Sequence, residues 1–234
     1  MTKDSITELL ESVDQNSDMW GELRRGKFTA STMSKLISEP KSKEAKDAGR
    51  LGEAGETLVA TKVAEILTGE VTESPNTLAI VWGHTHEPKA RELFSLRSKI
   101  EVELAGFCEY GLNAGGSPDG IFKDADGKRD GIIEIKCPYN SANHIEHLLI
   151  DSQEYFKTNF KEYYWQMQAN MLFTGTDKGF FISYDPRMGE DEQLFTILIK
   201  ADADDHKLID KKIEAAVKYK NEILNKINSK KQAA

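Results

Sequence analysis

The chain has 234 residues and a mass of 26.3 kDa, which is enough for one good-sized domain or two small ones. Apolar residues make up 39% of it and charged residues 30%, a composition that supports a buried core and excludes wholesale disorder. There are 31 Lys and Arg residues against 39 Asp and Glu, so the formal net charge of −8 argues against a surface covered in basic patches for nucleic acid.

This charge is unevenly distributed. The segment from His206 to the end holds eight lysines and three acids, a net charge of +5, which leaves −13 for the first 205 residues. Either this acidic part avoids polyanions, or its acids are concentrated where a cation neutralises them.

Cysteines and apolar runs indicate the compartment. Cys108 and Cys137 are too few for a disulfide framework, and they lack the spacing of a metal site. No apolar stretch is long enough for a signal peptide or a membrane span. We therefore expect a cytoplasmic protein without a membrane partner.

Helical signals dominate the first hundred residues. Thr29 is a plausible N-cap, Gly69 follows an apolar repeat of helical spacing, and Pro88 suits a first helical turn. The expected helices are 4–13, 30–37, 49–67 and 87–96.

In the middle of the chain the spacing of apolar residues changes from the helical period to the alternation of strands, and helical spacing returns later. Strands are expected at 100–104, 120–122, 131–138, 179–184 and 193–199, and helices at 141–150, 161–173 and about 203–229, the last one basic. Loops are short and no internal repeat is present, so we expect a single domain over 1–234. The order of elements predicts an α/β fold with a central mixed β-sheet flanked by helices.

The most informative segment couples Asp119 to Glu134 and Lys136. Side chains alternate along a strand, so Glu134 and Lys136 point the same way. If the strand after Asp119 pairs with theirs, two carboxylates and an ammonium converge at the end of a hairpin, which suits Mg²⁺. The alternative is a surface hairpin with solvated charges, but the apolar neighbours, such as Ile133, make unpartnered charges costly.

Glu87 is a third candidate carboxylate. It opens the helix expected at 87–96, where the positive helix end alone would explain an acid. His84 and His86 lie close by, but two histidines without further ligands make a weak zinc set.

Two further segments suit a phosphate. Arg24 and Ser31 lie in a run of cations and hydroxyls that leads into the helix expected at 30–37, although a capped surface helix explains them equally well. Gln168 falls on the apolar stripe of the helix expected at 161–173, so it either bonds the core backbone or reaches into the site, and Gln166 is the weaker candidate.

Taken together, these motifs resemble the phage lambda exonuclease family, the YqaJ-type viral recombinases within the PD-(D/E)xK nucleases. The resemblance covers Trp20 to about Met188 and implies a restriction-endonuclease-like core. Its landmarks are residues 20–31, 82–87, 117–120, 134–138, 166–168 and 184–188. Each landmark is weak alone, but six in order at similar spacing are specific.

The resemblance implies a metal-dependent 5′→3′ exonuclease that degrades one strand of linear duplex DNA to 5′-mononucleotides. It leaves a 3′ single strand for recombination by strand annealing. Asp119, Glu134, Glu87 and the backbone carbonyl of Ile135 would hold Mg²⁺, with two ions expected and Mn²⁺ as a substitute. Lys136 would orient the attacking water.

The same resemblance assigns the contacts with DNA. Arg24, Ser31 and Gln168 would bind the terminal 5′-phosphate, Ile80 would be the apolar wedge that splits the duplex end, and Lys41 would enter the DNA. Glu109 matches an acidic family position without a clear role.

Partners also follow from the resemblance: double-stranded DNA ends, two further copies of the chain in a homotrimeric ring, and a single-strand annealing protein. The basic helix at 203–229 gains no role, and the compartment would be the host cytoplasm if a phage encodes the chain. Two alternatives stay open, namely an endonuclease or resolvase of the same fold, and a catalytically inactive protein that binds DNA ends beside an annealing protein.

Overall fold

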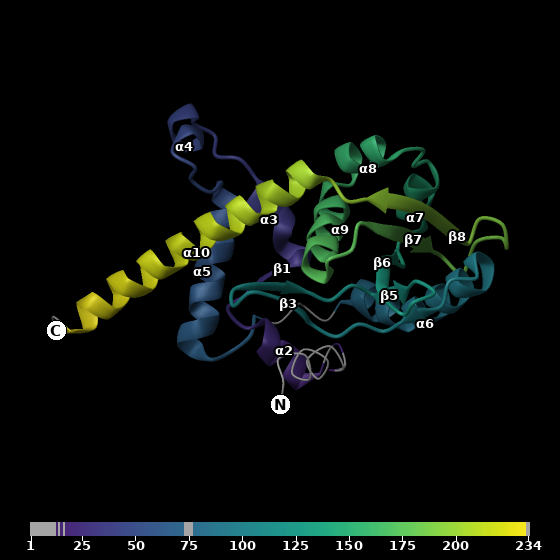
Figure 1. Ribbon diagram of the computed structural model, residues 1–234, viewed down its shortest axis with the longest axis horizontal. Helices are drawn as coiled ribbons and strands as arrows, with labels where there is room; N and C mark the ends of the chain where they lie inside the picture. Colours follow the sequence, from purple (N-terminus) through teal and green to yellow (C-terminus); the bar gives the residue numbers. More distant parts are fainter. Residues whose placement is uncertain (1–12, 14, 16, 73–76, 233–234) are drawn as a thin grey trace. The chain divides into compact units, whose positions relative to one another are not determined.

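The computed structural model describes residues 13, 15, 17–72 and 77–232 (Figure 1). The helix expected at 4–13 lies outside these residues, except for its last position. The chain forms two compact units, each assembled from separate stretches of sequence. The first unit comprises 1–73, 106–116 and 202–234, and the second comprises 74–105 and 117–201. The expectation of a single domain stays a prediction.

The first unit combines a small sheet with several helices. Its strands run in the order β1-β4-β3, with β1 parallel and β3 antiparallel to β4. Its described elements are α2 (Asp18–Arg24), β1 (Phe28–Thr29), the 3₁₀ helix η1 (Ala30–Thr32), α3 (Met33–Ile37), α4 (Lys43–Asp47), α5 (Glu53–Thr68), β3 (Cys108–Tyr110), β4 (Ala114–Gly116) and α10 (Ala203–Gln232).

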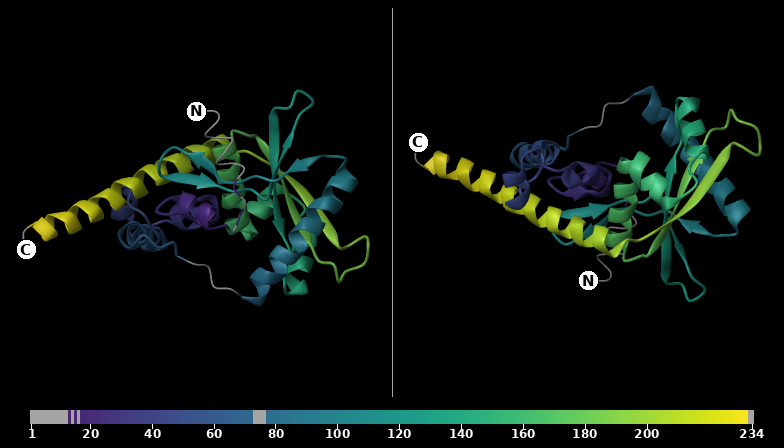
Figure 2. Two further views of the ribbon diagram at one scale, coloured as in Figure 1. Left: turned by 90° about the horizontal axis from the view of Figure 1, so that it is seen from below. Right: turned by 90° about the horizontal axis from the view of Figure 1, so that it is seen from above.

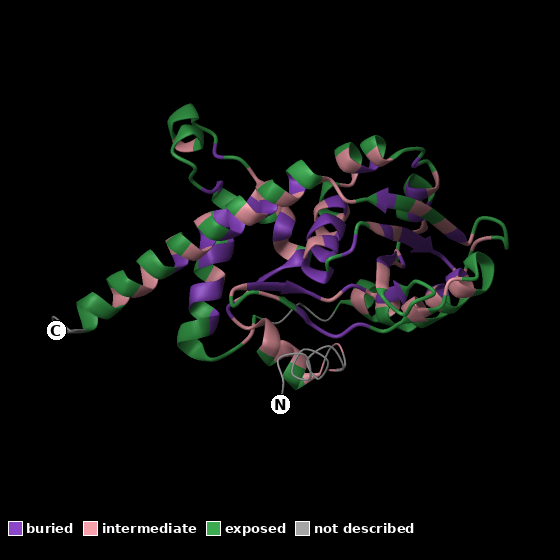
Figure 3. Cartoon of the chain, viewed as in Figure 1, coloured by how far each residue is buried: buried purple, intermediate pink, exposed green. Residues whose placement is uncertain are grey.

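The basic helix α10 is the longest element of this unit, and both Figure 1 and Figure 2 show it as one continuous helix. Its first half packs on α3 and α5 through buried residues that include Ile209, Ile213 and Ala216. Beyond Lys220 its residues are exposed or half-buried, as the green and pink colours in Figure 3 show. The inner half of α10 is therefore part of the core of the first unit.

The second unit is built on a five-stranded sheet in the order β2-β5-β6-β7-β8. Only β6 and β7 are parallel; the other neighbours are antiparallel. The elements of this unit are α6 (Leu78–Ser98), β2 (Val102–Glu103), β5 (Gly120–Lys123), β6 (Arg129–Lys136), α7 (Ser141–Leu148), α8 (Gln153–Asn159), α9 (Lys161–Thr174), β7 (Lys178–Tyr184) and β8 (Leu194–Lys200). The predicted α/β class with a mixed sheet flanked by helices is confirmed.

Strand β6 lies at the centre of this sheet and divides its two faces. Ile133 and Ile135 pack with Ala90 and Phe94 of α6 in one apolar cluster. The side chain of Glu134 points the other way, because side chains alternate along a strand, and it contacts α9. The two helices thus cover opposite faces of the sheet, and the site develops on the face under α9.

Helix α6 differs most from the expectation. It begins at Leu78, where the Thr77 hydroxyl accepts the N–H of Ile80, and it continues through Pro88 to Ser98. A proline inside a helix removes one backbone hydrogen bond but does not always end the helix. The prediction that Glu87 opens a helix is wrong, and the charge at a helix end cannot explain this acid.

Smaller differences concern ends and short elements. The helix expected at 30–37 splits into η1 and α3, the one at 49–67 begins later, at Glu53, and the strand at 100–104 shortens to β2. Three short helices and three short strands were not expected: α2, α4, α8, β1, β3 and β4.

No helix in the described ranges has the length and apolar character needed to cross a membrane.

Candidate active site

The hairpin of β5 and β6 brings Asp119 beside the end of β6. Gly120 lies opposite Ile133, and the Asp119 N–H donates to the Ile133 carbonyl at 3.1 Å. The N–H of Ile135 in turn donates to Asp119 Oδ2 at 2.6 Å. The expected pairing of these two strands is confirmed, and it fixes the Asp119 carboxylate against the backbone of β6.

Glu134 and Lys136 lie on the same face of β6 and form an ion pair. Lys136 Nζ donates to Glu134 Oε1 at 2.6 Å. The Glu134 side chain is 0% exposed and that of Lys136 is 26% exposed. This burial excludes the alternative of a solvated surface hairpin, because a carboxylate without exposure needs partners inside the protein.

Helix α9 supplies two more partners of this carboxylate. Gln166 Nε2 donates to Glu134 Oε1 at 2.6 Å, and Asn170 Nδ2 is 3.3 Å from Oε2. The Oδ1 atom of Asn170 is buried without a hydrogen-bond partner. Gln166 and Asn170 are four residues apart, so they share one side of the helix. That spacing is the signal the sequence reasoning missed when it ranked Gln166 as the weaker candidate.

Gln168 lies elsewhere on α9. It is fully buried, and its Nε2 donates to the carbonyl of Lys200 at 2.9 Å. Of the two possibilities considered from the sequence, the structure shows the bond to the core backbone. A role for Gln168 in binding a phosphate stays a prediction.

The pKa values of the three acids are raised, chiefly because the acids are buried. Burial raises the pKa of Glu134 to about 8, against the attraction of Lys136 and with the help of Asp119. Burial likewise raises the pKa of Asp119 and of Glu87, which is half-buried on α6 and feels the charge of Asp119. Burial disfavours the Lys136 ammonium, but the carboxylates of Glu134 and Asp119 outweigh it and raise the pKa of this lysine.

Burial alone favours the neutral form of Glu134, but three N–H donors aim at its oxygens and favour the ionised carboxylate beside a charged Lys136. Arg91 adds a further cation, and its Nε donates to the Asp119 carbonyl at 3.2 Å. The charge of Asp119 nonetheless raises the pKa of both Glu134 and Glu87, and a bound cation would relieve that repulsion.

Carboxylate oxygens are the donors that Mg²⁺ prefers, so the chemistry of Glu87, Asp119 and Glu134 fits a divalent ion. Within the described part of the chain, however, no three His, Cys, Asp or Glu side chains gather closely enough to hold a metal. Both oxygens of Glu134 already accept hydrogen bonds. Metal binding would require these bonds to rearrange.

The neighbouring histidines offer no support for zinc. The ring of His86 lies 4.0 Å from that of Trp82, between centroids, and His84 is exposed. The guanidinium of Arg187 lies 4.5 Å from the centre of the Trp82 ring and bonds the carbonyl of Tyr139. His86 and Trp82 thus belong to a packed aromatic group.

The segment expected to bind a phosphate lies in the first unit. The Arg24 guanidinium lies 3.9 Å from the centre of the Trp20 ring, and burial lowers the pKa of Arg24 to about 10, against the attraction of Glu65. Ser31 is exposed, and its hydroxyl is 3.2 Å from that of Thr29. Since η1 and α3 are both short, the dipole expected from one helix at 30–37 is weak.

The remaining candidate residues take separate positions. Ile80 is half-buried in the first turn of α6. In the first unit, Lys41 is 93% exposed and pairs with Glu53 at 3.3 Å, while Glu109 pairs with Lys27. Arg24, Ser31 and Lys41 belong to the first unit and Ile80 and Gln168 to the second, so their joint action on DNA stays a prediction.

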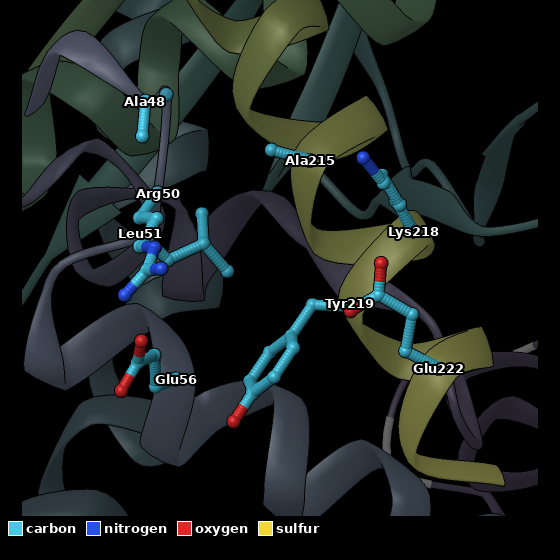
Figure 4. A pocket seen from close by; sticks show the side chains of 9 residues that line it. Ala48, Arg50, Leu51, Glu56, Ala215, Lys218, Tyr219 and Glu222 are labelled. Carbon is cyan, nitrogen blue, oxygen red and sulfur yellow. The ribbon is translucent and has the colours of Figure 1, made fainter. Parts of the chain in front are cut away.

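A cavity of about 440 Å³ lies in the first unit, between the start of α5 and α10 (Figure 4). Arg50, Glu56, Lys218 and Glu222 line it with mixed charges, and Tyr219 adds a hydroxyl. None of the predicted catalytic residues contributes to it.

The fold and the buried carboxylate–lysine pair define a class of α/β proteins with a polar site at the end of a central hairpin. Comparison with known proteins identifies the family. The YqaJ-like viral recombinase domain matches residues 19–177, which is more than half of the chain, and the chain belongs to this family.

Solved structures agree with this assignment. An alkaline exonuclease from Laribacter hongkongensis, LHK-Exo, is 28% identical with a TM-score of 0.75, and the match covers 93% of this chain and all of that one. The complex of LHK-Exo with dAMP matches with a TM-score of 0.76 at the same identity and coverage.

A phage-related exonuclease from Haemophilus somnus 129PT shares the fold at 20% identity, with a TM-score of 0.71 and 88% of this chain and 99% of that one covered. None of the curated proteins matches the chain. The family and the LHK-Exo structures together support a nuclease.

Proposed function

We propose that this protein is a metal-dependent 5′→3′ exonuclease on linear double-stranded DNA. It would degrade one strand to 5′-mononucleotides and leave a 3′ single strand for recombination by strand annealing. The observation that carries the proposal is the buried pair of Glu134 and Lys136, fixed beside Asp119 at the end of the β5–β6 hairpin. Membership of the recombinase family and the likeness to an alkaline exonuclease support it.

The residues of the second unit take distinct chemical roles. Asp119, Glu134, Glu87 and the carbonyl of Ile135 would hold Mg²⁺, which when bound supplies charge neutralisation at the phosphate and a more acidic water. Lys136 orients the attacking water and balances the charge that develops on the phosphate. Gln166 and Asn170 hold the Glu134 carboxylate in place.

Recognition of the DNA end would involve other residues. Arg24, Ser31 and Gln168 would bind the terminal 5′-phosphate, since Arg presents a fork of donors that matches phosphate oxygens. Ile80 would separate the strands, and Lys41 would contact the duplex as a point charge. A homotrimeric ring would keep the enzyme on its DNA, and an annealing protein would receive the 3′ strand.

A time course on defined DNA tests the proposal. The substrates are one duplex with 5′-phosphate ends, the same duplex with 5′-hydroxyl ends, and a closed circle, each with and without Mg²⁺. We expect loss of the 5′-phosphorylated linear strand with release of mononucleotides, only when Mg²⁺ is present.

Two other results would favour the alternatives. Rapid cutting of the closed circle would indicate an endonuclease or resolvase. Binding of DNA ends without any cleavage, in either Mg²⁺ or Mn²⁺, would indicate an inactive end-binding protein.

A further inference from the structure

The basic helix α10 places one lysine inside the protein. Lys220 is 5% exposed, and its Nζ donates to the carbonyl of Gly26 at 3.0 Å and to Asn113 Oδ1 at 2.8 Å. The ammonium also lies 5.3 Å from the centre of the Phe28 ring. All four residues belong to the first unit, so this contact ties α10 to the turn that follows Arg24.

The Gly26 residue is bonded at both its N–H and its carbonyl. While Lys220 bonds the carbonyl, the N–H of Gly26 donates to Glu65 Oε2 at 2.8 Å. Glu65 is buried and is itself held by Lys62, whose Nζ lies 2.8 Å from Oε1 and 3.0 Å from Oε2. Gly26 has a φ of +69°, and a Cβ there would lie 2.7 Å from Ile66 Cγ1. Only glycine fits this conformation without strain.

The residues on either side of Gly26 are fixed as well. Arg25 Nη1 donates to the Gly69 carbonyl at 2.8 Å, and the Phe28 N–H donates to the Asn113 carbonyl at 2.8 Å. The N–H of Lys27 bonds the Arg24 carbonyl at 3.0 Å. The turn from Arg24 to Phe28 is therefore held from outside at Arg25, Gly26 and Phe28 and closed by the bond between Lys27 and Arg24.

A fixed backbone matters for Arg24 because its guanidinium can bond a phosphate with two parallel hydrogen bonds only in a narrow range of positions. The Trp20 ring restrains the guanidinium from one side, and the turn restrains the Cα. Direct contact of Lys220 with DNA does not suit its position, since it is buried and both of its hydrogen bonds are made within the protein.

We propose that Lys220 is a positioning residue for recognition of the 5′-phosphate, because its bond to the Gly26 carbonyl fixes the turn that presents Arg24. The inference rests on the proposed function, and it deepens that proposal by giving a role to the basic C-terminal helix. The helix serves the phosphate site by holding Arg24 in place, not through the charge of this lysine.

The test compares kcat/KM on one duplex carrying either a 5′-phosphate or a 5′-hydroxyl. The ratio of the two values does not depend on how much of a preparation is folded, so it separates positioning from simple loss of stability. The variants are Lys220→Met, which keeps the length and removes the donor, and Arg24→Ala as the benchmark. Lys218→Met is the matched control, since Lys218 is an exposed lysine on the same helix.

We expect Arg24→Ala to bring the ratio close to one. Lys220→Met removes two hydrogen bonds, of which the one to the Gly26 carbonyl holds the turn directly. It should lower the ratio about fivefold, the scale of that one bond, through a higher KM for the phosphorylated end and an unchanged kcat. Lys218→Met should keep the wild-type ratio. Asn113→Ala removes the other partner of Lys220 and should shift the ratio in the same direction. If Lys220→Met has no activity, the ratio in Asn113→Ala tests the positioning role in its place.

Two outcomes overturn the inference in different ways. A wild-type ratio in both Lys220→Met and Asn113→Ala, with a reduced ratio in Arg24→Ala, refutes the role of Lys220 and leaves the phosphate site standing. A wild-type enzyme without any preference for the phosphorylated end refutes the phosphate site itself, and the inference with it.

Discussion

Glu134 is the residue whose surroundings are most constrained. Its carboxylate has no exposure and accepts bonds from Lys136, Gln166 and Asn170. An isolated charge in such a place would cost several kcal/mol, so the surrounding donors are needed for the acid to stay ionised. Each of these donors comes from β6 or from α9, which links the state of this acid to the packing of the helix on the sheet.

Lys136 gives the first test of this arrangement. In Lys136→Ala the Glu134 carboxylate loses its charged partner, and the proposed orienting group for water is removed. We expect cleavage to fall by at least about a hundredfold, the scale of a lost transition-state contact, while binding of DNA ends changes little. Single-turnover cleavage and fluorescence anisotropy on the same duplex measure the two effects. A variant that cuts at the wild-type rate would show that the lysine is not catalytic.

His147 is a second buried group with an unusual titration. Its Nδ1 and that of His144 both lie 2.7 Å from Ser183 Oγ, and His144 Nε2 lies 2.8 Å from the Glu192 carbonyl. The Glu192 carbonyl accepts from His144 Nε2, and the Ser183 hydroxyl lies between the two Nδ1 atoms and links the rings. Burial, followed by the charges of His144 and Lys136, lowers the pKa of His147 to about 4.

The sign of the pH effect follows from this depressed pKa. The unfolded chain takes up a proton near pH 6.5 and the folded protein only near 4, so stability is complete above 6.5 and falls as the pH drops between these values. The loss amounts to about 3 kcal/mol at most. His147→Asn keeps a donor near the same place but does not titrate. We expect it to flatten the urea-unfolding free energy between pH 6.5 and 4.

The control for this measurement is the wild-type protein in the same series of buffers. An unchanged slope in His147→Asn would show that other groups cause the acid sensitivity.

At the scale of elements, α6 carries Glu87 and contains Pro88. A proline at this position has no N–H for the His84 carbonyl, four residues earlier, yet the helix continues for ten residues beyond it. Ala90 and Phe94 anchor this later part in the apolar cluster with β6. Packing against the sheet thus outweighs the local cost of the proline.

This balance predicts the effect of Pro88→Ala. Pro88 is exposed, so little packing is lost, while the new N–H can bond the His84 carbonyl. We expect a gain of about 1–3 kcal/mol in the free energy of unfolding, seen as a higher Tm in calorimetry. Lys89→Ala is a suitable control, because Lys89 is exposed and bonds Glu92 on the same helix. A lower Tm in Pro88→Ala would show that the ring itself stabilises the fold.

The features that could be predicted from the sequence are those set by residues close together in the chain. The alternation around Glu134 and the turn at Pro118–Gly120 are local, and they were enough to predict the hairpin and the convergence of Asp119 with Lys136. The strands β1, β3 and β4 have two or three residues each, too few to show a period. They are held by pairing with distant segments, which no local pattern reveals.

The same reasoning explains the ranking of the two glutamines. In the sequence Gln166 ranks below Gln168 because Gln168 falls on the apolar stripe of α9, where an amide needs a partner either in the core or in the site. The helix in fact presents Gln166 and Asn170 to Glu134 and packs Gln168 against Lys200. A polar pair four residues apart was the available signal, but only the position of the sheet decides which face of a helix meets an acid.

At the scale of the whole molecule, the uneven charge has a partly internal explanation. Lys220 and Lys212, two of the lysines in the positive C-terminal segment, are buried and bond Gly26, Asn113 and Glu39. The exposed lysines of α10 are evenly divided, with Lys207, Lys211 and Lys218 before Lys220 and Lys226, Lys230 and Lys231 after it. In the second unit, part of the negative charge is the set of carboxylates around Glu134, which a bound cation would neutralise.

The proposed trimer can be tested by its mass, and the net charge of the chain adds a prediction of how the trimer depends on salt. A ring that admits duplex and releases a single strand cannot leave its substrate between cuts, so the proposed function predicts light scattering at three times the chain mass of 26.3 kDa. Each copy carries a net charge of −8, so the copies repel one another across a Debye length of about 30 Å at 0.01 M salt but only about 10 Å at 0.1 M. At micromolar protein we therefore expect the trimer fraction to rise between these two salt concentrations. A monomer mass at both would remove the ring, and processive digestion would then need another explanation.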